Sequence, residues 1–252
     1  MKPLTQLLRI TFVAALLILW HVSARRQAVH ILPGPLAVAA GIAELAQRGL
    51  LLKYVVASLF RVTWGYIAAA ALGIPLGLAI GWHKRAEMAL NPLIEILRPI
   101  SPLAWIPISI LWFGVGDMAA IFLIFLASFL PMIVTAINAV STIPQVYVNA
   151  GRNFGLSQNQ LVYRVLYAAA APQLIIGLRI TLGVAWLVVV AAEMIAVNSG
   201  LGFLIVDARN AGNRYDLVVA GMVMIGLIGL MLDTALRSIE KSKSLQWGYS
   251  ED

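Results

Sequence analysis

The chain has no cysteine and few charged side chains, and each shortage excludes a class of protein. Without cysteine there is neither a secreted disulfide scaffold nor a thiolate metal site. Only 12% of the 252 residues are charged, against roughly a quarter in soluble domains, which is too few to cover a water-facing surface. The net charge is +7, but the basic residues are scattered along the chain, which argues against nucleic-acid binding.

What the chain has instead is long apolar stretches. Hydrophobic residues make up 61% of it and the mean hydropathy is +0.90, which predicts an all-α polytopic membrane protein. Because a span needs roughly 20 mainly apolar residues, we predict six spans, at residues 7–22, 55–82, 92–113, 118–140, 173–197 and 217–236. The first is short and is followed by small residues, so a cleaved signal peptide is the alternative there.

The basic residues outside the spans predict the orientation. Six spans put both termini on one side of the membrane. That side carries nine Lys and Arg residues: Lys2, Arg9, Lys84, Arg85, Arg152, Arg164, Arg237, Lys241 and Lys243. The other side carries six: Arg25, Arg26, Arg48, Lys53, Arg209 and Arg214. Cytoplasmic loops are richer in Lys and Arg, so we expect both termini in the cytoplasm.

Small residues and prolines predict how the spans pack. Small residues recur at every fourth position of the second span: Gly65, Ala69, Gly73, Gly77 and Gly81. Such a ridge lets another helix approach closely. Pro99, Pro102 and Pro107 predict a kinked or broken third span. Asp117 and Asp216 each stand before an apolar run, where we expect them to cap a helix.

The loop at about residues 141–172 carries specific local signals. Gly155 can take the left-handed conformation that stops a helix, and Ser157 with Gln160 can form a capping box. Leu156 and Leu161 fall at the positions of a hydrophobic staple. We therefore predict a helical hairpin on the cytoplasmic face, with one helix near residues 144–154 and a second near 158–167.

The same loop resembles that of the permease subunits of bacterial ABC importers. Their pattern is Glu-Ala-Ala, three residues, Gly, nine residues, Ile, one residue, Leu-Pro; here Ala150, Gly155 and Val165 fit it. Asn149 replaces the acid, Gly151 replaces the second alanine, and Tyr167-Ala168 stand in place of Leu-Pro. Residues 31–35, 91–114 and 177–205 are also similar to the nitrate, sulfonate and taurine group of these permeases.

This resemblance implies a type I importer whose single membrane domain is this chain, 1–252. Two copies would form the channel in the bacterial inner membrane, two ABC ATPase subunits would bind below, and a periplasmic or lipid-anchored binding protein would deliver substrate. ATP and Mg would belong to the ATPase, and this chain would hold no cofactor or metal. Its other contacts would be membrane lipids, not nucleic acid. The implied ATPase-coupling residues are Asn149, Ala150, Gly151, Phe154, Gly155, Leu156 and Ser157.

Six ionisable residues inside the predicted spans are candidate functional positions, because burying a charge in lipid is costly. They are Arg61, Glu95, Arg98, Arg179, Glu193 and Asp233. On the fifth span Arg179, Trp186 and Glu193 recur every seven residues and so share one face, which favours the path or a partner subunit over lipid. With Arg98 they are our candidates for the translocation path. For Glu193 we expect a structural bond to another helix, and for Glu95 a local ion pair with Arg98.

Two other functions fit parts of the sequence less well. A membrane enzyme would need a clustered nucleophile and base or a metal site, but His21, His30 and His83 are far apart and no paired-carboxylate motif is present. A secondary transporter or channel could also have broken helices and intramembrane charges, and a neighbouring ATPase gene would distinguish it from an importer. The substrate stays open among nitrate, bicarbonate, taurine, alkanesulfonates and similar small molecules.

Overall fold

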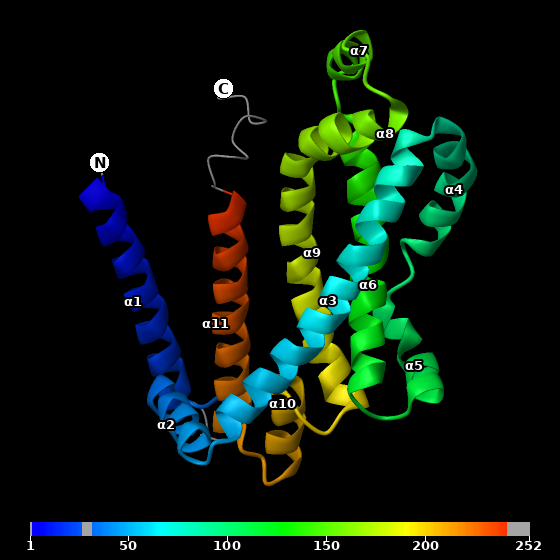
Figure 1. Ribbon diagram of the computed structural model, residues 1–252. Helices are drawn as coiled ribbons and strands as arrows, with labels where there is room; N and C mark the ends of the chain where they lie inside the picture. The colour runs from blue at the N-terminus through cyan, green and yellow to red at the C-terminus, as the bar shows by residue number, and fades with distance from the viewer. Residues whose placement is uncertain (1, 27–31, 241–252) are drawn as a thin grey trace.

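The computed structural model describes residues 2–26 and 32–240, where every regular element is helical, as predicted (Figure 1). The elements in chain order are α1 (Lys2–Arg26), α2 (Pro35–Gln47), α3 (Leu50–Trp82), α4 (Lys84–Leu97), the 3₁₀ helix η1 (Pro102–Trp105), α5 (Ile106–Phe113), α6 (Asp117–Ser141), α7 (Gln145–Asn153), α8 (Gln158–Leu161), the π-helical η2 (Val162–Leu166), α9 (Tyr167–Ala196), α10 (Leu201–Asn210) and α11 (Tyr215–Glu240).

The long helices run between two ends of the molecule. One end holds α7 and α8 together with the start of α1 and the end of α11, and the other end holds α2, α5 and α10 (Figure 1). The loop helix α7 thus lies at the same end as the first and last described helical turns. This arrangement is the one expected if the loop and both termini share a side of the membrane.

Helix α3 packs on α6 through the predicted glycine ridge. A Cβ added at Gly65 would lie 2.8 Å from the carbonyl oxygen of Ile121, and one at Gly77 would lie 2.5 Å from that of Ile133. Both distances are too short for a real side chain, so only glycine permits this approach. Since α6 also packs on α9, these three helices form the centre of the subunit.

Within the described residues, four helical stretches are long and apolar enough to cross a membrane. They are α3, α6, the continuous stretch Gln158–Ala196 and Tyr215–Ser238 of α11. The predicted break in the third span at residues 92–113 is confirmed, because α4 and the stretch Pro102–Phe113 are bent by 78°. The break falls between Leu97 and Pro102, and Ser101, with ψ of 129°, has the extended conformation that a following proline favours. Counting the bent pair as one span gives five.

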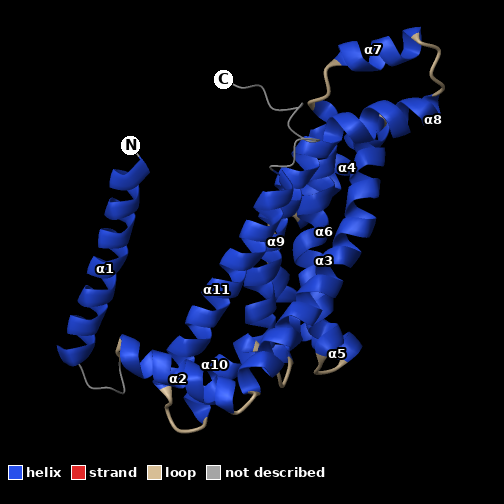
Figure 2. Cartoon of the chain, turned by 60° about the vertical axis from the view of Figure 1, so that its left-hand side comes forward, coloured by secondary structure: helices blue, strands red, loops and turns tan. Residues whose placement is uncertain are grey.

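The first predicted span lies within α1, which stands apart from the rest of the bundle (Figure 2). Near its end the Trp20 indole Nε1 donates to the carbonyl oxygen of Pro33 at 3.1 Å. Along residues 7–19 the apolar side chains, including Leu8 and Phe12, are exposed. An apolar helix exposed in this way needs lipid or another protein surface around it.

Candidate functional site

The turn after α7 has the predicted geometry. Gly155 takes the left-handed conformation, with φ of +76°. The Gln160 backbone N–H donates to Ser157 Oγ at 3.4 Å, and the Ser157 backbone N–H donates to Gln160 Oε1 at 2.9 Å. These two bonds complete the predicted capping box at the start of α8. The direction in which α7 leaves the bundle is therefore fixed by its own sequence.

The second helix of the hairpin does not end near residue 167 as predicted. α8, η2 and α9 form one helical stretch from Gln158 to Ala196, and the chain turns at η2 from lying across the bundle to running along it (Figure 1). A π-helical turn can absorb a bend without ending the helix. Pro172 removes only one backbone hydrogen bond, which packed neighbours allow. The hairpin is thus joined directly to a long membrane helix.

One face of α7 is packed tightly on the start of that long helix. Val148 and Gly151 are buried on this face. A Cβ added at Gly151 would lie 2.6 Å from Leu161 Cδ2 and 3.3 Å from Leu156 Cδ1, so both residues of the predicted staple lie against Gly151. This contact gives a physical reason for glycine at the position where the permease loop pattern that this loop resembles has its second alanine.

The remaining surface of α7 and of the turn after it exposes apolar side chains beyond the membrane-length helices. Phe154 is 86% exposed, and Val146 and Tyr147 are exposed beside it on the same short helix and turn. Asn149 is exposed as well, and Ala150 is half-buried. Exposed aromatic and aliphatic groups on a projecting helix are typical of a protein-docking surface.

At the opposite end, a buried arginine joins four segments of the chain. Arg61 on α3 is 2% exposed. Its Nη1 donates to Glu193 Oε1 on α9 at 2.6 Å and to the Ser199 carbonyl oxygen at 2.7 Å. Its Nε donates to Asp117 Oδ1 on α6 at 2.8 Å, and its Nη2 donates to Ser199 Oγ. We call Ser58, Arg61, Asp117, Glu193 and Ser199 the charge network.

Glu193 is fully buried and all its contacts are internal. Besides Arg61, its carboxylate accepts from Ser58 Oγ at 2.9 Å and from the Gly202 backbone N–H at 2.9 Å. A buried carboxylate is stable only when it is paired and hydrogen-bonded in this way. Glu193 therefore has the structural bond to another helix that its position in the sequence predicts.

Asp117 does not cap α6 as predicted. The residue before the helix is Gly116, and no side chain caps this N-terminus. Asp117 is the first helical residue, and its carboxylate instead forms an ion pair with Arg61, with a 2.7 Å distance to Nη2. The nearby guanidinium competes for the oxygens that a cap would use.

With the loop and the network described, the comparisons with known proteins decide the family. Residues 73–244 match the model of the binding-protein-dependent transport system inner membrane component. The chain belongs to this permease family. It is 36% identical to the taurine transport system permease protein of Escherichia coli over 243 residues, covering 93% of this chain and 87% of that one.

Other relatives and a solved structure agree. A putative ABC transporter permease protein of Methanocaldococcus jannaschii is 42% identical over 193 residues (76% of this chain, 72% of that one), and a nitrate import permease protein of Synechocystis is 39% identical over 184 residues (73% and 66%). The fold matches the inward-facing MetNI methionine ABC transporter with a TM-score of 0.68 at 20% identity, covering 76% of this chain and 95% of that one. This chain is therefore a multi-pass inner-membrane ABC permease, and ATP hydrolysis belongs to a separate subunit.

In the permease, the candidates for the translocation path are not gathered at one place. Arg179 Nε lies 2.7 Å from Asp233 Oδ1 on α11, and Trp186 Nε1 donates to the Ile225 carbonyl oxygen on α11 at 3.1 Å. The stripe of Arg179, Trp186 and Glu193 thus contacts α11 and α3 of the same subunit. Arg98 is exposed at the end of α4, away from this stripe.

The predicted ion pair between Glu95 and Arg98 is wrong. Glu95 Oε1 instead accepts from Asn91 Nδ2, one helical turn earlier, at 2.8 Å. Arg98 directly follows the last residue of α4, and its side chain is exposed. Arg98 stays a path candidate only by its position.

One cluster of the permease escaped the sequence analysis. Arg214 binds Glu44 of α2 at 2.6 Å and Asp216 of α11 at 2.8 Å, which joins two helices far apart in sequence. The hydrogen bond from Arg214 holds the pKa of Glu44 below its usual value. In the charge network, Ser58 lies one turn before Arg61 on α3, which is a visible signal. Nothing in the sequence, however, pairs Ser58 with Glu193 or Arg61 with Ser199.

Proposed function

We propose that this permease forms, with a second copy of itself, the membrane path of an ATP-driven importer, and that α7 docks on an ATPase subunit. The observation that carries the proposal is the exposed apolar face of α7 on a fixed, capped hairpin. The chain has no Gly-rich loop ending in Lys-Ser or Lys-Thr that could hold ATP phosphates. Its energy must therefore arrive through a contact surface, and ATP and Mg would be bound by the partner.

The path by which α7 would act follows from its attachments. Gly151 seats α7 against Leu161 at the start of the long helix, and that helix continues to Ala196. Near its far end Glu193 is bound to Arg61. A displacement of α7 by the ATPase would therefore be carried along one continuous helix to the charge network at the opposite end.

The remaining partners and the orientation follow the same arrangement. We place α7 and both termini in the cytoplasm and the end with α2, α5 and α10 in the periplasm, where a free or lipid-anchored binding protein would dock. A second copy would cover the exposed apolar face of α1, and a symmetric pair would serve two ATPase subunits with one kind of loop.

For the substrate we propose a small anion or zwitterion. The relatives are named for taurine, nitrate and aliphatic sulfonates, which share compact size and an oxyanion group. Bicarbonate would fit the same description. Purifying the binding protein encoded beside this permease and measuring which of these ligands raises its melting temperature tests the class.

Docking through α7 is tested by placing a charge on its exposed face. Phe154→Asp should prevent the ATPase from copurifying with the permease, because a carboxylate would be buried unpaired in the contact. Asn159→Asp, which adds the same negative charge at an exposed position on α8, is the control and should leave the complex intact. Copurification of the ATPase with both variants in wild-type amounts would contradict the proposal.

A further inference from the structure

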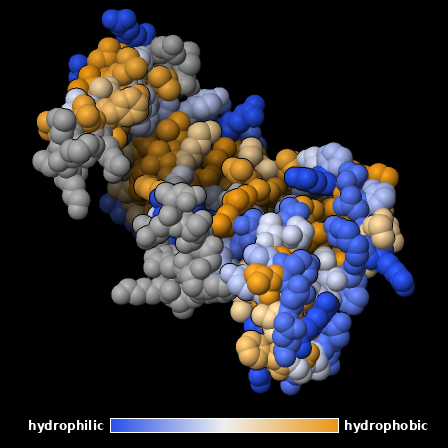
Figure 3. Space-filling view, turned by 90° about the horizontal axis from the view of Figure 1, so that it is seen from above, coloured by the Kyte–Doolittle hydropathy of each residue, from blue (hydrophilic) through white to orange (hydrophobic). Residues whose placement is uncertain are grey.

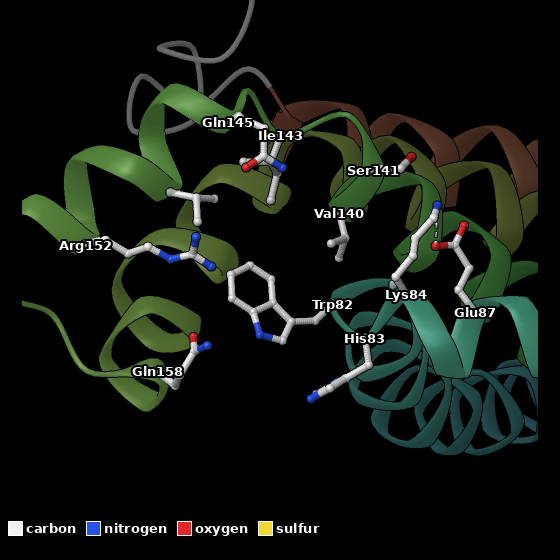
Figure 4. A pocket seen from close by; sticks show the side chains of 12 residues that line it. Trp82, His83, Lys84, Glu87, Val140, Ser141, Ile143, Gln145, Arg152 and Gln158 are labelled. Carbon is white, nitrogen blue, oxygen red and sulfur yellow. Dashed lines mark hydrogen bonds and ion pairs between the residues drawn. The ribbon is translucent and has the colours of Figure 1, made fainter.

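A polar cavity of about 560 Å³ lies between the loop hairpin and the bundle. Its walls come from the end of α3 and the start of α4, the end of α6, and the inner side of α7 and α8 (Figure 4). The volume falls within the roughly 300–1,000 Å³ of small-molecule sites. The surface above these elements is mainly hydrophilic, in contrast to the apolar side chains near α1 (Figure 3).

The charge in this cavity is not balanced. Arg152, in the last turn of α7, directs its guanidinium toward the middle of the cavity, near the Trp82 indole (Figure 4). Its side chain has no hydrogen bond or ion pair with any residue in 2–26 or 32–240. Glu87 is the only carboxylate among the lining residues, and it is paired with Lys84 at 3.1 Å. Among the described residues, one permanent positive charge is thus left without a counter-charge.

Further hydrogen-bond donors surround this guanidinium. The side-chain amides of Gln145 and Gln158 line the same cavity, one from the start of α7 and the other from the start of α8. The Trp82 indole N–H also has no acceptor among the described residues. A guanidinium fork with amide and indole N–H groups around it matches the oxygens of a phosphate or sulfate group.

We propose that this cavity binds a small oxyanion of the phosphate or sulfate type, taken from solution or carried as a lipid phosphate. The occupant would touch α7 through Arg152 and Gln145 and the bundle through the turn at His83. It would therefore hold the inner side of α7 to the membrane helices, while Phe154 on the outer side stays exposed. Binding does not depend on the proposed docking of the ATPase; only its effect on ATP hydrolysis does.

The direct test uses the complete purified transporter, delipidated in detergent and without nucleotide. Its melting temperature should rise saturably with sulfate, compared with chloride at equal ionic strength to remove general screening. Arg152→Gln should weaken the apparent affinity roughly ten- to a hundredfold, the loss expected for hydrogen bonds to a charged group. Arg164→Gln, an exposed arginine of the same hairpin that does not line the cavity, should bind sulfate as the wild type does.

A short-chain phosphatidylglycerol, titrated in place of sulfate, separates the two sources of the oxyanion. If sulfate raises the melting temperature and the rise depends on Arg152, the occupant is a free ion. If only the lipid raises the melting temperature and the rise depends on Arg152, the occupant is a lipid headgroup. If neither probe gives a saturable rise, or if Arg152→Gln responds like the wild type, the site does not exist. If a side chain of the ATPase fills the cavity, neither probe will raise the melting temperature saturably.

The consequence for coupling is measured separately. Sulfate should change the rate of ATP hydrolysis stimulated by loaded binding protein in the wild type and in Arg164→Gln, with little change in Arg152→Gln. Because the melting measurement needs no hydrolysis, it stands even if α7 proves not to be the coupling element. An equal effect of sulfate on hydrolysis in all three proteins would show that the anion does not act through this cavity.

Discussion

Gly155 is the residue at which the direction of α7 is decided, because its φ of +76° is a conformation that a β-branched residue cannot readily adopt. Gly155→Val should therefore abolish transport while the permease still inserts and has the correct size. The ATPase should either be lost on purification or no longer be stimulated by loaded binding protein.

Ser157→Ala is the graded comparison for Gly155→Val. It removes one side of the capping box and should cost about 1 kcal/mol of helix stability, with a smaller effect on uptake. Normal uptake and normal stimulated hydrolysis in Gly155→Val would show that this hairpin does not couple the two subunits.

A second prediction at this scale concerns the buried pair of Arg61 and Glu193. Arg61→Met leaves a buried carboxylate without its main partner, so unfolding in detergent should become easier by about 3–5 kcal/mol. Combining it with Glu193→Met removes both charges and should recover part of that loss. A double variant as unstable as the sum of both single variants would mean that the two side chains do not interact.

At the scale of helices, the contact of α3 with α6 allows a comparison of two glycines. Gly77→Ala would bring a Cβ to 2.5 Å from a backbone oxygen that cannot move independently, whereas Gly183 has nothing within 4 Å. We expect Gly77→Ala to lower the melting temperature of the purified permease and Gly183→Ala to leave it unchanged or slightly raised. Equal melting temperatures would argue against this close approach.

Local features of the helices could be predicted from the sequence, and contacts between distant segments could not. The hairpin signals at Gly155 and Ser157 act within a few residues, and the ridge including Gly65 and Gly77 repeats at one helical period, so both were predicted correctly. The 78° bend was foreseen at its prolines but not in its extent, because the bend angle depends on neighbouring helices. Partners such as Ser199 for Arg61 depend on how distant segments meet, which no local pattern records.

For the whole molecule, the exposed α1 and the one loop hairpin that we propose to dock on an ATPase subunit predict a two-fold assembly. The purified transporter should contain two copies of this permease and two ATPase subunits, measured by mass under native conditions. A complex with two different permease chains in equal amounts would contradict this. Since the chain has no cysteine, a single cysteine introduced at the exposed Phe12 of α1 reports the contact directly by crosslinking between copies.

The glycine contacts between α3 and α6 also restrict how the permease can change shape. Where backbone touches backbone, sliding by one helical turn of about 5.4 Å would push side chains into carbonyl oxygens all along the pair. We therefore expect α3 and α6 to move together as one rigid body during the transport cycle. We expect alternating access to the two sides of the membrane to come from the bend between α4 and α5 and from rotation of the α3–α6 pair against the proposed second copy.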